Sequence, residues 1–366
     1  MSTKNEKDNS DKIAIIKNLG FKILKEIESG QNPFLDIPVR AFSNVHYNET
    51  KKVIELGSAT SKRYFFNVSH IRKFVQTAEV ANLAIKLLNI DKHLSLRQVF
   101  YAMRRTIPNT KIDIVDEQTE SNQAIEDLEL ITGLPREQFN VNAKKSGAAA
   151  GKIVIEDKED IIDLSKMGSG GWSIPSNTEN LKFKKVDAKY VIYMEKDTMW
   201  ERLNEDRFWD KNNCVIIASQ GQATRGIRRL LKRLSEEYKL PIYVLVDFDP
   251  WGFYIYSVLK FGSIDLANFS DKLAITEAKF LGMSAEDIKK YDLEKQKIKF
   301  KDVDQKRLEQ IKNYDWFKND KRWQNQFEQM GKMSSKVELD ALITRGIAFV
   351  SEKYLPEKIK NKDWID

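Results

Sequence analysis

A tyrosine stands among arginines in residues 95–106, SLRQVFYAMRRT. On a helix that begins at Ser95, one face would carry only apolar side chains, those of Leu96, Val99, Phe100 and Met103. Tyr101 lies about 140° round this helix from Leu96. Its neighbours at i−4, i+3 and i+4 are three arginines, Arg97, Arg104 and Arg105. Cations favour the charged form of a phenol, whose pKa is about 10, and can hold phosphate oxygens. The pattern therefore suits attack of Tyr101 on a phosphodiester; a surface tyrosine stacked on arginine stems is the alternative.

Three carboxylates follow apolar, β-rich runs in the second half of the chain. Glu195 ends the run YVIYME, and Asp247 and Asp249 end the run YVLVDFD, where the Asp-x-Asp spacing would point both side chains to the same side of a strand. Ligands bind at the carboxyl ends of strands in an open parallel sheet, so adjacent strands would bring the three side chains to one edge. Crowded carboxylates repel one another unless a hard divalent cation joins them, and Mg²⁺ suits carboxylate, water and phosphate ligands. Acidic residues are also common at strand ends, which leaves a structural role open.

Basic residues provide candidate contacts to DNA phosphates. A helix predicted between two of the strands carries Arg225, Arg228, Arg229, Lys232 and Arg233. It would form a positive track for DNA beside the metal site, or else a solvated face. The predicted helix 122–132 carries Glu126, Asp127 and Glu129 and is poorly suited to a DNA groove, so Lys144 and Lys145 are further candidates. The glycine-rich segment 167–175 lacks the Lys-Ser/Thr ending of a phosphate-binding loop, and nothing indicates ATP binding.

Helical periodicity and capping signals predict the elements of the first half. Helices are expected over residues 12–27, over 70–89, from Ser95 with Gln98 completing a capping box, and over 122–132 before Gly133. Residues 53–66 indicate a β-hairpin turning at Gly57, and residues 1–11 a disordered tail. These elements fit a small domain of helix-turn-helix or winged-helix type, with a boundary in the small-residue stretch 146–152.

The second half has the pattern of an α/β sheet. The runs YVIYME, CVIIAS and PIYVLVDFD are predicted strands, and a long helix between the last two implies parallel pairing. The lone cysteine, Cys214, lies in one of these runs and is expected to be a buried apolar residue. The net charge of +7 suits a polyanionic partner, and no apolar run is long enough for a membrane helix. With no signal region either, an intracellular protein is expected.

Taken in order, these motifs resemble the A subunits of archaeal-type DNA topoisomerase VI, a family related to the transesterase of meiotic double-strand breaks. The tyrosine motif is LRQVFYAM, and the metal-binding Toprim motifs are YMEKD and VDFDPWG. The likeness continues through GLPREQFNV, KKSGAAAGKI, KFLGMSAEDI and KVELDALITRGIAFVSEKYLPEKI, from about His70 to the C-terminus. One departure is Ala223, where family members often have proline.

The resemblance implies an α/β multidomain fold. An N-terminal tail, helix and hairpin (1–69) would precede a winged-helix-like, tyrosine-bearing (5Y-CAP) domain (70–145) and a Toprim domain with a C-terminal helical extension (146–366). Tyr101 would form a 5′-phosphotyrosyl link in each strand of double-stranded DNA, working with Mg²⁺ held by Glu195, Asp247 and Asp249 of the other subunit.

The resemblance also implies partners: a homodimer of A subunits and a GHKL-type ATPase B subunit, together an A2B2 heterotetramer that binds ATP through the B subunit. The complex would act in the cytoplasm, with the nucleoid, and without membrane association. A break-making protein that does not reseal, a Toprim nuclease that uses metal-activated water, and a catalytically silent DNA-binding scaffold are the alternatives.

Overall fold

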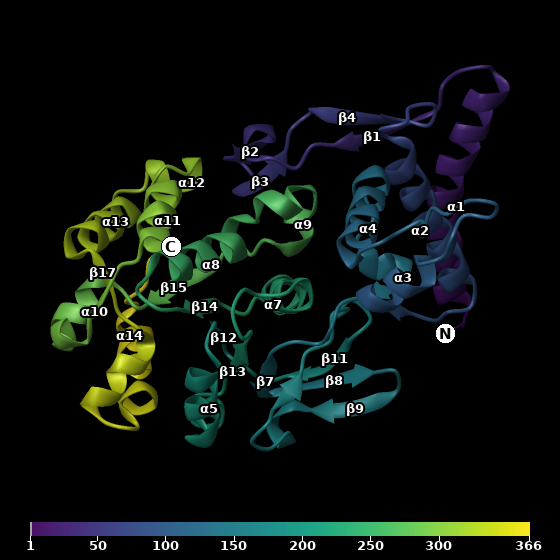
Figure 1. The fold of residues 1–366 in the computed structure, drawn as a ribbon. Coiled ribbons are helices and arrows are strands. Elements are labelled where there is room, and N and C mark those ends of the chain that lie inside the picture. The colour runs from purple at the N-terminus through teal and green to yellow at the C-terminus, as the bar shows by residue number, and fades with distance from the viewer. Residues whose placement is uncertain (1) are drawn as a thin grey trace. The chain divides into compact units, whose positions relative to one another are not determined.

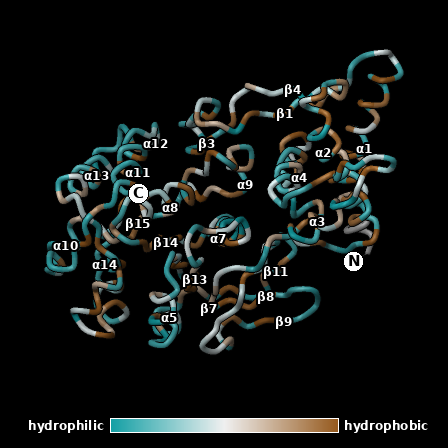
Figure 2. Tube along the Cα trace, in the orientation of Figure 1, coloured by the Kyte–Doolittle hydropathy of each residue, from teal (hydrophilic) through white to brown (hydrophobic). Residues whose placement is uncertain are grey.

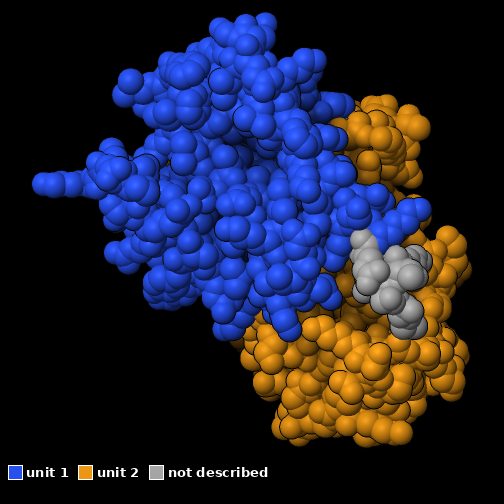
Figure 3. All heavy atoms as spheres, turned by 90° about the vertical axis from the view of Figure 1, so that its right-hand side faces the viewer, with its two compact units in different colours: residues 1–46, 56–144 blue, residues 47–55, 145–366 orange. Residues whose placement is uncertain are grey.

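The computed structural model describes residues 2–366, without the side chains of residues 2–6. The chain divides into two compact units (Figure 3). The first comprises residues 1–46 and 56–144, and the second comprises residues 47–55 and 145–366. In the described part of the chain, no helix is both long and apolar enough to cross a membrane.

The first unit is mainly helical, with short two-stranded sheets (Figure 1). Its helices are α1 (Ser2–Glu28), α2 (Ile71–Asn89), α3 (Leu96–Met103) and α4 (Gln118–Thr132). Strand β1 (Phe34–Pro38) pairs with β4 (Thr60–Tyr64), and β5 (Leu94–Ser95) pairs with β6 (Val141–Asn142). The core lies between α2, α3 and α4 and includes Val80, Val99, Leu128 and Phe139. This core holds α3 by its apolar face.

The capping signals of the first unit are confirmed. The Ser95 hydroxyl accepts a hydrogen bond from the Gln98 backbone N–H (3.2 Å), and the Gln98 side chain accepts one from the Ser95 N–H (2.8 Å). Gly133 ends α4 in the left-handed conformation, with φ of 68°. The predicted helix over 122–132 begins four residues earlier, at Gln118.

Two expectations for the N-terminal region are wrong. Helix α1 begins at Ser2, so residues 2–11 are helical rather than a disordered tail; Met1 lies outside the described residues. Polar contacts stabilise the part of the helix that precedes its periodic apolar residues. Asp8 forms an ion pair with Lys12, and the Asn9 amide donates a hydrogen bond to the Leu88 carbonyl. The predicted hairpin over 53–66 is two separate pairings: β3 (Val53–Leu56) pairs with β2 (Val45–Asn48), whereas β4 pairs with β1.

The second unit is built on a six-stranded sheet in the order β10-β7-β13-β12-β14-β15. These strands are β7 (Ala148–Gly151), β10 (Trp172–Ser173), β12 (Val191–Met194), β13 (Val215–Ala218), β14 (Ile242–Leu245) and β15 (Lys279–Gly282). Strand β12 lies between β13 and β14 and runs parallel to both. The strands on either side of the long helix are thus parallel, as predicted, but they do not pair with each other. The apolar residues of these strands, which can be followed by hydropathy in Figure 2, are buried, and so is Cys214.

Helices and a second sheet accompany this central sheet. The helices are α5 (Asp197–Glu205), α6 (Phe208–Lys211), α7 (Arg225–Tyr238), α8 (Pro250–Phe261), α9 (Ser270–Leu273), α10 (Ala285–Lys290), α11 (Asp302–Lys312), α12 (Asp315–Lys318), α13 (Lys321–Met333) and α14 (Leu355–Asn361). The second sheet is antiparallel, in the order β11 (Lys182–Val186), β8 (Ile153–Asp157), β9 (Asp160–Asp163). A short pair joins β16 (Ile298–Lys299) to β17 (Ser335–Lys336), and the 3₁₀ segment η6 (Leu339–Arg345) follows β17. The chain is therefore mixed α/β, as predicted.

Candidate active site

Tyr101 lies on the solvent face of α3. The helix buries Val99, Phe100 and Met103, whereas the Tyr101 side chain is 56% exposed. Within the described chain, its hydroxyl makes no hydrogen bond. The Arg97 guanidinium lies 6.0 Å from the centre of the Tyr101 ring. The amphipathic pattern thus predicted the orientation of Tyr101 correctly, and its oxygen is accessible to a substrate.

The three neighbouring arginines have different surroundings. Arg97 lies against the Tyr101 ring, but Arg104 lies over the ring of Phe100, at 5.8 Å from its centre. Arg105 forms an ion pair with Glu79 of α2, at 2.7 Å, and remains half exposed. The expectation of three guanidinium groups gathered around Tyr101 is therefore wrong for Arg104 and Arg105 in this conformation.

The predicted carboxylates lie beyond the ends of two neighbouring parallel strands. Glu195 directly follows β12, while Asp247 and Asp249 follow β14, which ends at Leu245. Asp247 is buried, and its Oδ1 accepts a hydrogen bond from the Leu339 N–H at 2.8 Å. Asp249 caps α8, because its Oδ1 accepts a hydrogen bond from the Gly252 N–H at 2.5 Å. The strand alternation expected for Asp-x-Asp does not apply, since the chain leaves the strand before Asp247.

The carboxylates are close enough to influence one another electrostatically. Burial and the charges of Asp249 and Asp247 together raise the pKa of Glu195 to about 7. Burial and the charge of Asp247 raise the pKa of Asp249 to about 6, against the hydrogen bond from Gly252. Burial also raises the pKa of Asp247. Oxygen donors that are buried or half-buried and repel one another suit a hard divalent cation.

A lysine lies beside this cluster. The Lys196 ammonium is 3.0 Å from Asp247 Oδ2, 2.9 Å from Glu338 and 2.8 Å from Asp340. Among the side chains that the structure describes, those of residues 7–366, no three acidic, histidine or cysteine groups converge tightly enough to hold a metal ion. Side-chain rotation is therefore needed before Glu195, Asp247 and Asp249 can share one ion. The sequence analysis did not assign Lys196, Glu338 or Asp340 to the site, although they lie in the motifs YMEKD and KVELD.

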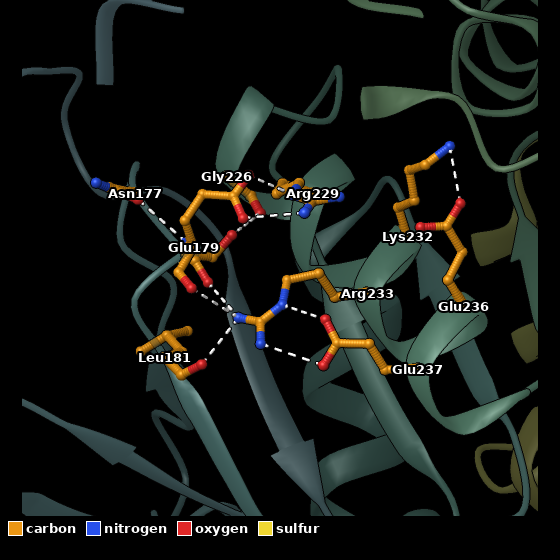
Figure 4. Close-up of polar contacts among 10 residues, drawn as sticks. Asn177, Glu179, Leu181, Gly226, Arg229, Lys232, Arg233, Glu236 and Glu237 are labelled. Atoms are coloured by element: carbon orange, nitrogen blue, oxygen red, sulfur yellow. Dashed lines mark hydrogen bonds and ion pairs between the residues drawn. The ribbon is translucent and has the colours of Figure 1, made fainter. Parts of the chain in front are cut away.

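The basic side chains of α7 mostly hold the fold together (Figure 4). Arg233 is buried and donates to the carbonyls of Thr178 (2.6 Å) and Leu181 (2.9 Å). Lys232 is buried as well and donates to the Ala274 carbonyl at 2.8 Å. Arg228 is only 2% exposed, and burial lowers its pKa to about 10. The prediction that these three residues belong to an exposed positive track is therefore wrong, because other segments of the chain cover this side of the helix.

Other predicted DNA contacts are more accessible. Arg229 is half-buried and forms an ion pair with Glu179, at 2.5 Å from Nε to Oε1. Arg225 is half-buried and lies 6.0 Å from the centre of the Phe269 ring. Lys144 and Lys145 are both exposed.

Known proteins resemble this chain over nearly its whole length. The A subunit of type 2 DNA topoisomerase 6 from Pyrococcus abyssi is 44% identical, with 94% of this chain and 93% of the relative covered. The proteins of the same name from Hyperthermus butylicus and Methanocaldococcus jannaschii are 38% and 33% identical, with at least 95% of each chain covered. The chain belongs to the family of type 2 DNA topoisomerase 6 A subunits. It is thus the DNA-cleaving subunit of a type IIB DNA topoisomerase.

Three family descriptions divide the chain of this topoisomerase subunit. Residues 72–141 match "Type IIB DNA topoisomerase", and this match contains Tyr101. Residues 190–359 match the Toprim domain of the topoisomerase 6 A subunit and Spo11, and this match contains the carboxylates and Lys196. Toprim domains generally bind divalent metal ions, so the second unit carries a metal-binding fold. Residues 145–187 match "All-beta domain in DNA topoisomerase VI alpha subunit", which includes β8, β9 and β11. The sequence analysis did not separate this segment from the Toprim domain.

Proposed function

We propose that Tyr101 is the nucleophile with which this topoisomerase subunit cuts DNA. Its phenolic oxygen attacks a backbone phosphorus, the 3′ oxygen of the neighbouring nucleotide leaves, and a 5′-phosphotyrosyl ester forms. The ester keeps the energy of the broken bond, so attack by the same 3′ hydroxyl reseals the strand. The exposed position of Tyr101 on α3, inside the match to the type IIB topoisomerase family, carries this proposal.

Exposed basic residues of the chain would contact the DNA backbone. Arg97 lies closest to the Tyr101 ring and would hold the phosphate that is attacked. Arg104, Arg105, Lys144 and Lys145 are exposed and would contact neighbouring phosphates. A winged-helix-like arrangement of the 5Y-CAP domain, over residues 70–145, is consistent with helices α2, α3 and α4 and the β5–β6 pair.

Glu195, Asp247 and Asp249 would hold Mg²⁺ in the Toprim domain. All three offer oxygen donors, and their burial and mutual repulsion favour a small divalent cation over a neutral partner. When bound, the ion would stabilise the charge that develops on the phosphate and on the leaving oxygen. Glu195 and Asp249 would position the ion, and the Leu339 N–H holds the Asp247 carboxylate in place.

Two copies of the subunit would act together with an ATPase. One tyrosine per chain cuts one strand, so a two-fold dimer matches the antiparallel strands of DNA. Tyr101 of one subunit would work with the carboxylates of the other. The sequence contains no phosphate-binding loop of the P-loop type, and ATP would be handled by a GHKL-type B subunit in an A2B2 heterotetramer. The complex would act on chromosomal DNA in the cytoplasm.

Mixed dimers test this arrangement. Subunits carrying Tyr101→Phe are combined with subunits carrying Glu195→Gln, together with the ATPase subunit, and cleavage of supercoiled DNA is measured. If Tyr101 acts with the carboxylates of the other subunit, each mixed dimer retains one complete site and nicks a single strand. If each site is built within one subunit, neither site is complete and no nicks above background appear. The two homodimers serve as controls and should not cut.

A further inference from the structure

Lys196 is held by three carboxylates from two other segments of the second unit. Its ammonium lies within 3.0 Å of an oxygen of Asp247, Glu338 and Asp340. Asp247 follows β14, whereas Glu338 and Asp340 flank the start of η6, more than 140 residues from Lys196 along the chain. Carboxylate oxygens are also the ligands that a hard divalent ion prefers.

The position of this ammonium is determined by the surrounding fold. Only Glu195 and Lys196 lie between β12 and α5, so the backbone of Lys196 is fixed by the end of one element and the start of the next. Asp340 is held from a second side, because the Thr198 hydroxyl donates to its Oδ1 at 2.9 Å. Asp247 Oδ1 accepts from the Leu339 N–H, which leaves Oδ2 for Lys196. The Lys196 side chain is only 25% exposed.

A pocket opens next to these groups. It has a volume of about 530 Å³, and its lining includes Glu195, Lys196, Glu338 and Asp340. Lys196 thus lines the same pocket as the predicted metal ligand Glu195 and the carboxylates of Glu338 and Asp340. The positive charge of Lys196 would repel a cation that approached the carboxylates of Asp247, Glu338 and Asp340.

We propose that Lys196 is a built-in cation that occupies a second cation position of the Toprim site, formed by Asp247, Glu338 and Asp340. In the native chain this position takes no divalent ion, because the tethered ammonium already occupies it. Lys196 is thus a positioning residue: it holds Asp247 toward the site of the divalent ion at Glu195 and Asp249. The inference rests on the proposed metal site, and it assigns a role to Glu338 and Asp340 that the proposed function leaves open.

Removal of the ammonium should create a divalent-cation site. The purified full-length chain is titrated with Mn²⁺, and bound ions per chain are counted by equilibrium dialysis. The variant Lys196→Met should bind one more Mn²⁺ ion than the native chain. The double variant Lys196→Met, Asp340→Asn should not bind this additional ion. Lys196→Arg keeps the charge and should give the native count. Lys189→Met is the matched control, since it removes an exposed lysine just before the other end of β12.

The double variant Glu338→Gln, Asp340→Asn tests the proposal without altering Lys196. If Lys196 occupies the position, this variant binds as many Mn²⁺ ions as the native chain. A count lower by one would mean that Glu338 and Asp340 hold a metal in the native chain, and it would overturn the proposal. An unchanged count in a folded Lys196→Met chain, verified by circular dichroism, would overturn it as well.

A further variant separates this inference from the proposed metal site. Glu195→Gln combined with Asp249→Asn should remove the ion of the native chain. If the native count does not fall, the proposed ligands are wrong, while the extra ion in Lys196→Met still supports the role of Lys196. If the native count falls but Lys196→Met gains no ion, the metal site stands and the inference about Lys196 fails.

Discussion

Substitution of Arg233 by methionine should destabilise the second unit without weakening DNA binding. Methionine keeps the apolar stem of the side chain and removes the guanidinium. The guanidinium donates to the buried carbonyls of Thr178 and Leu181 and pairs with Glu237 (Figure 4). These contacts tie α7 to the segment that leads into β11. The substitution therefore leaves buried acceptors without a donor.

The expected loss follows from the number of buried contacts. A hydrogen bond from a charged donor contributes roughly 1.5–3 kcal/mol, and a buried acceptor left without a partner keeps its desolvation cost. Two such bonds give a loss of about 4 kcal/mol. The pair with Glu237 adds little, because that carboxylate is 42% exposed. Arg229→Met is the matched control: its partner Glu179 is 40% exposed, and the loss should be about 0.5–1 kcal/mol.

Urea denaturation of the purified chain measures the free energy of unfolding, and titration of duplex DNA at several salt concentrations measures phosphate contacts. A residue that contacts a phosphate contributes about 0.9 to the slope of log affinity against log salt. Arg233→Met should leave this slope unchanged under conditions where the chain is folded. A loss of stability below about 1 kcal/mol, or a slope reduced by about one, would refute the structural role of Arg233.

Two further predictions concern the carboxylates and a buried lysine. Magnesium-dependent cleavage at limiting Mg²⁺ should fall by about 100-fold or more in each of the variants Glu195→Gln, Asp247→Asn and Asp249→Asn. Each substitution removes one charge from the ligands of the ion and keeps the shape of the side chain. A native rate for any variant in a cleavage assay would exclude that residue as a ligand. Lys260 is buried and donates to the Ala278 carbonyl at 2.7 Å, and burial lowers its pKa from 10.5 to about 8. Between these values the unfolded chain binds a proton that the folded chain does not, so stability rises with pH. The unfolding free energy of the native chain relative to Lys260→Met should therefore increase by about 2 kcal/mol between about pH 8 and about pH 9.5, and a constant difference in urea denaturation would contradict this.

The local features of both sites could be predicted from the sequence. The capping box at Ser95 and the apolar stripe of α3 are local patterns, and they determine the outward position of Tyr101. The strands before Glu195 and Asp247 are short apolar runs, and the long helix α7 between β13 and β14 indicates a parallel arrangement of the sheet. Such patterns depend on neighbours within a few residues along the chain, so a single sequence contains them.

Contacts between distant segments could not be predicted in this way. Lys196 meets Glu338 and Asp340 only because η6 returns to the end of β12, and no periodicity encodes that return. The burial of Arg228 has the same cause: helical spacing identifies the leucine face of α7, but not the chain that covers its other side. The pairing of β3 with β2, rather than with β4, also depends on strands outside the predicted hairpin.

Trapping of the covalent complex tests the central role of Tyr101 most directly. The assembled enzyme is incubated with Mg²⁺ and end-labelled duplex DNA, denatured with detergent, and digested to identify the residue that carries the 5′ phosphate. The native enzyme should yield a 5′-phosphotyrosyl adduct at Tyr101. Tyr101→Phe should bind DNA with native affinity, because Arg97 and the other basic residues remain, and should yield no adduct. An adduct of native yield with Tyr101→Phe would place the nucleophile at another residue and contradict the account.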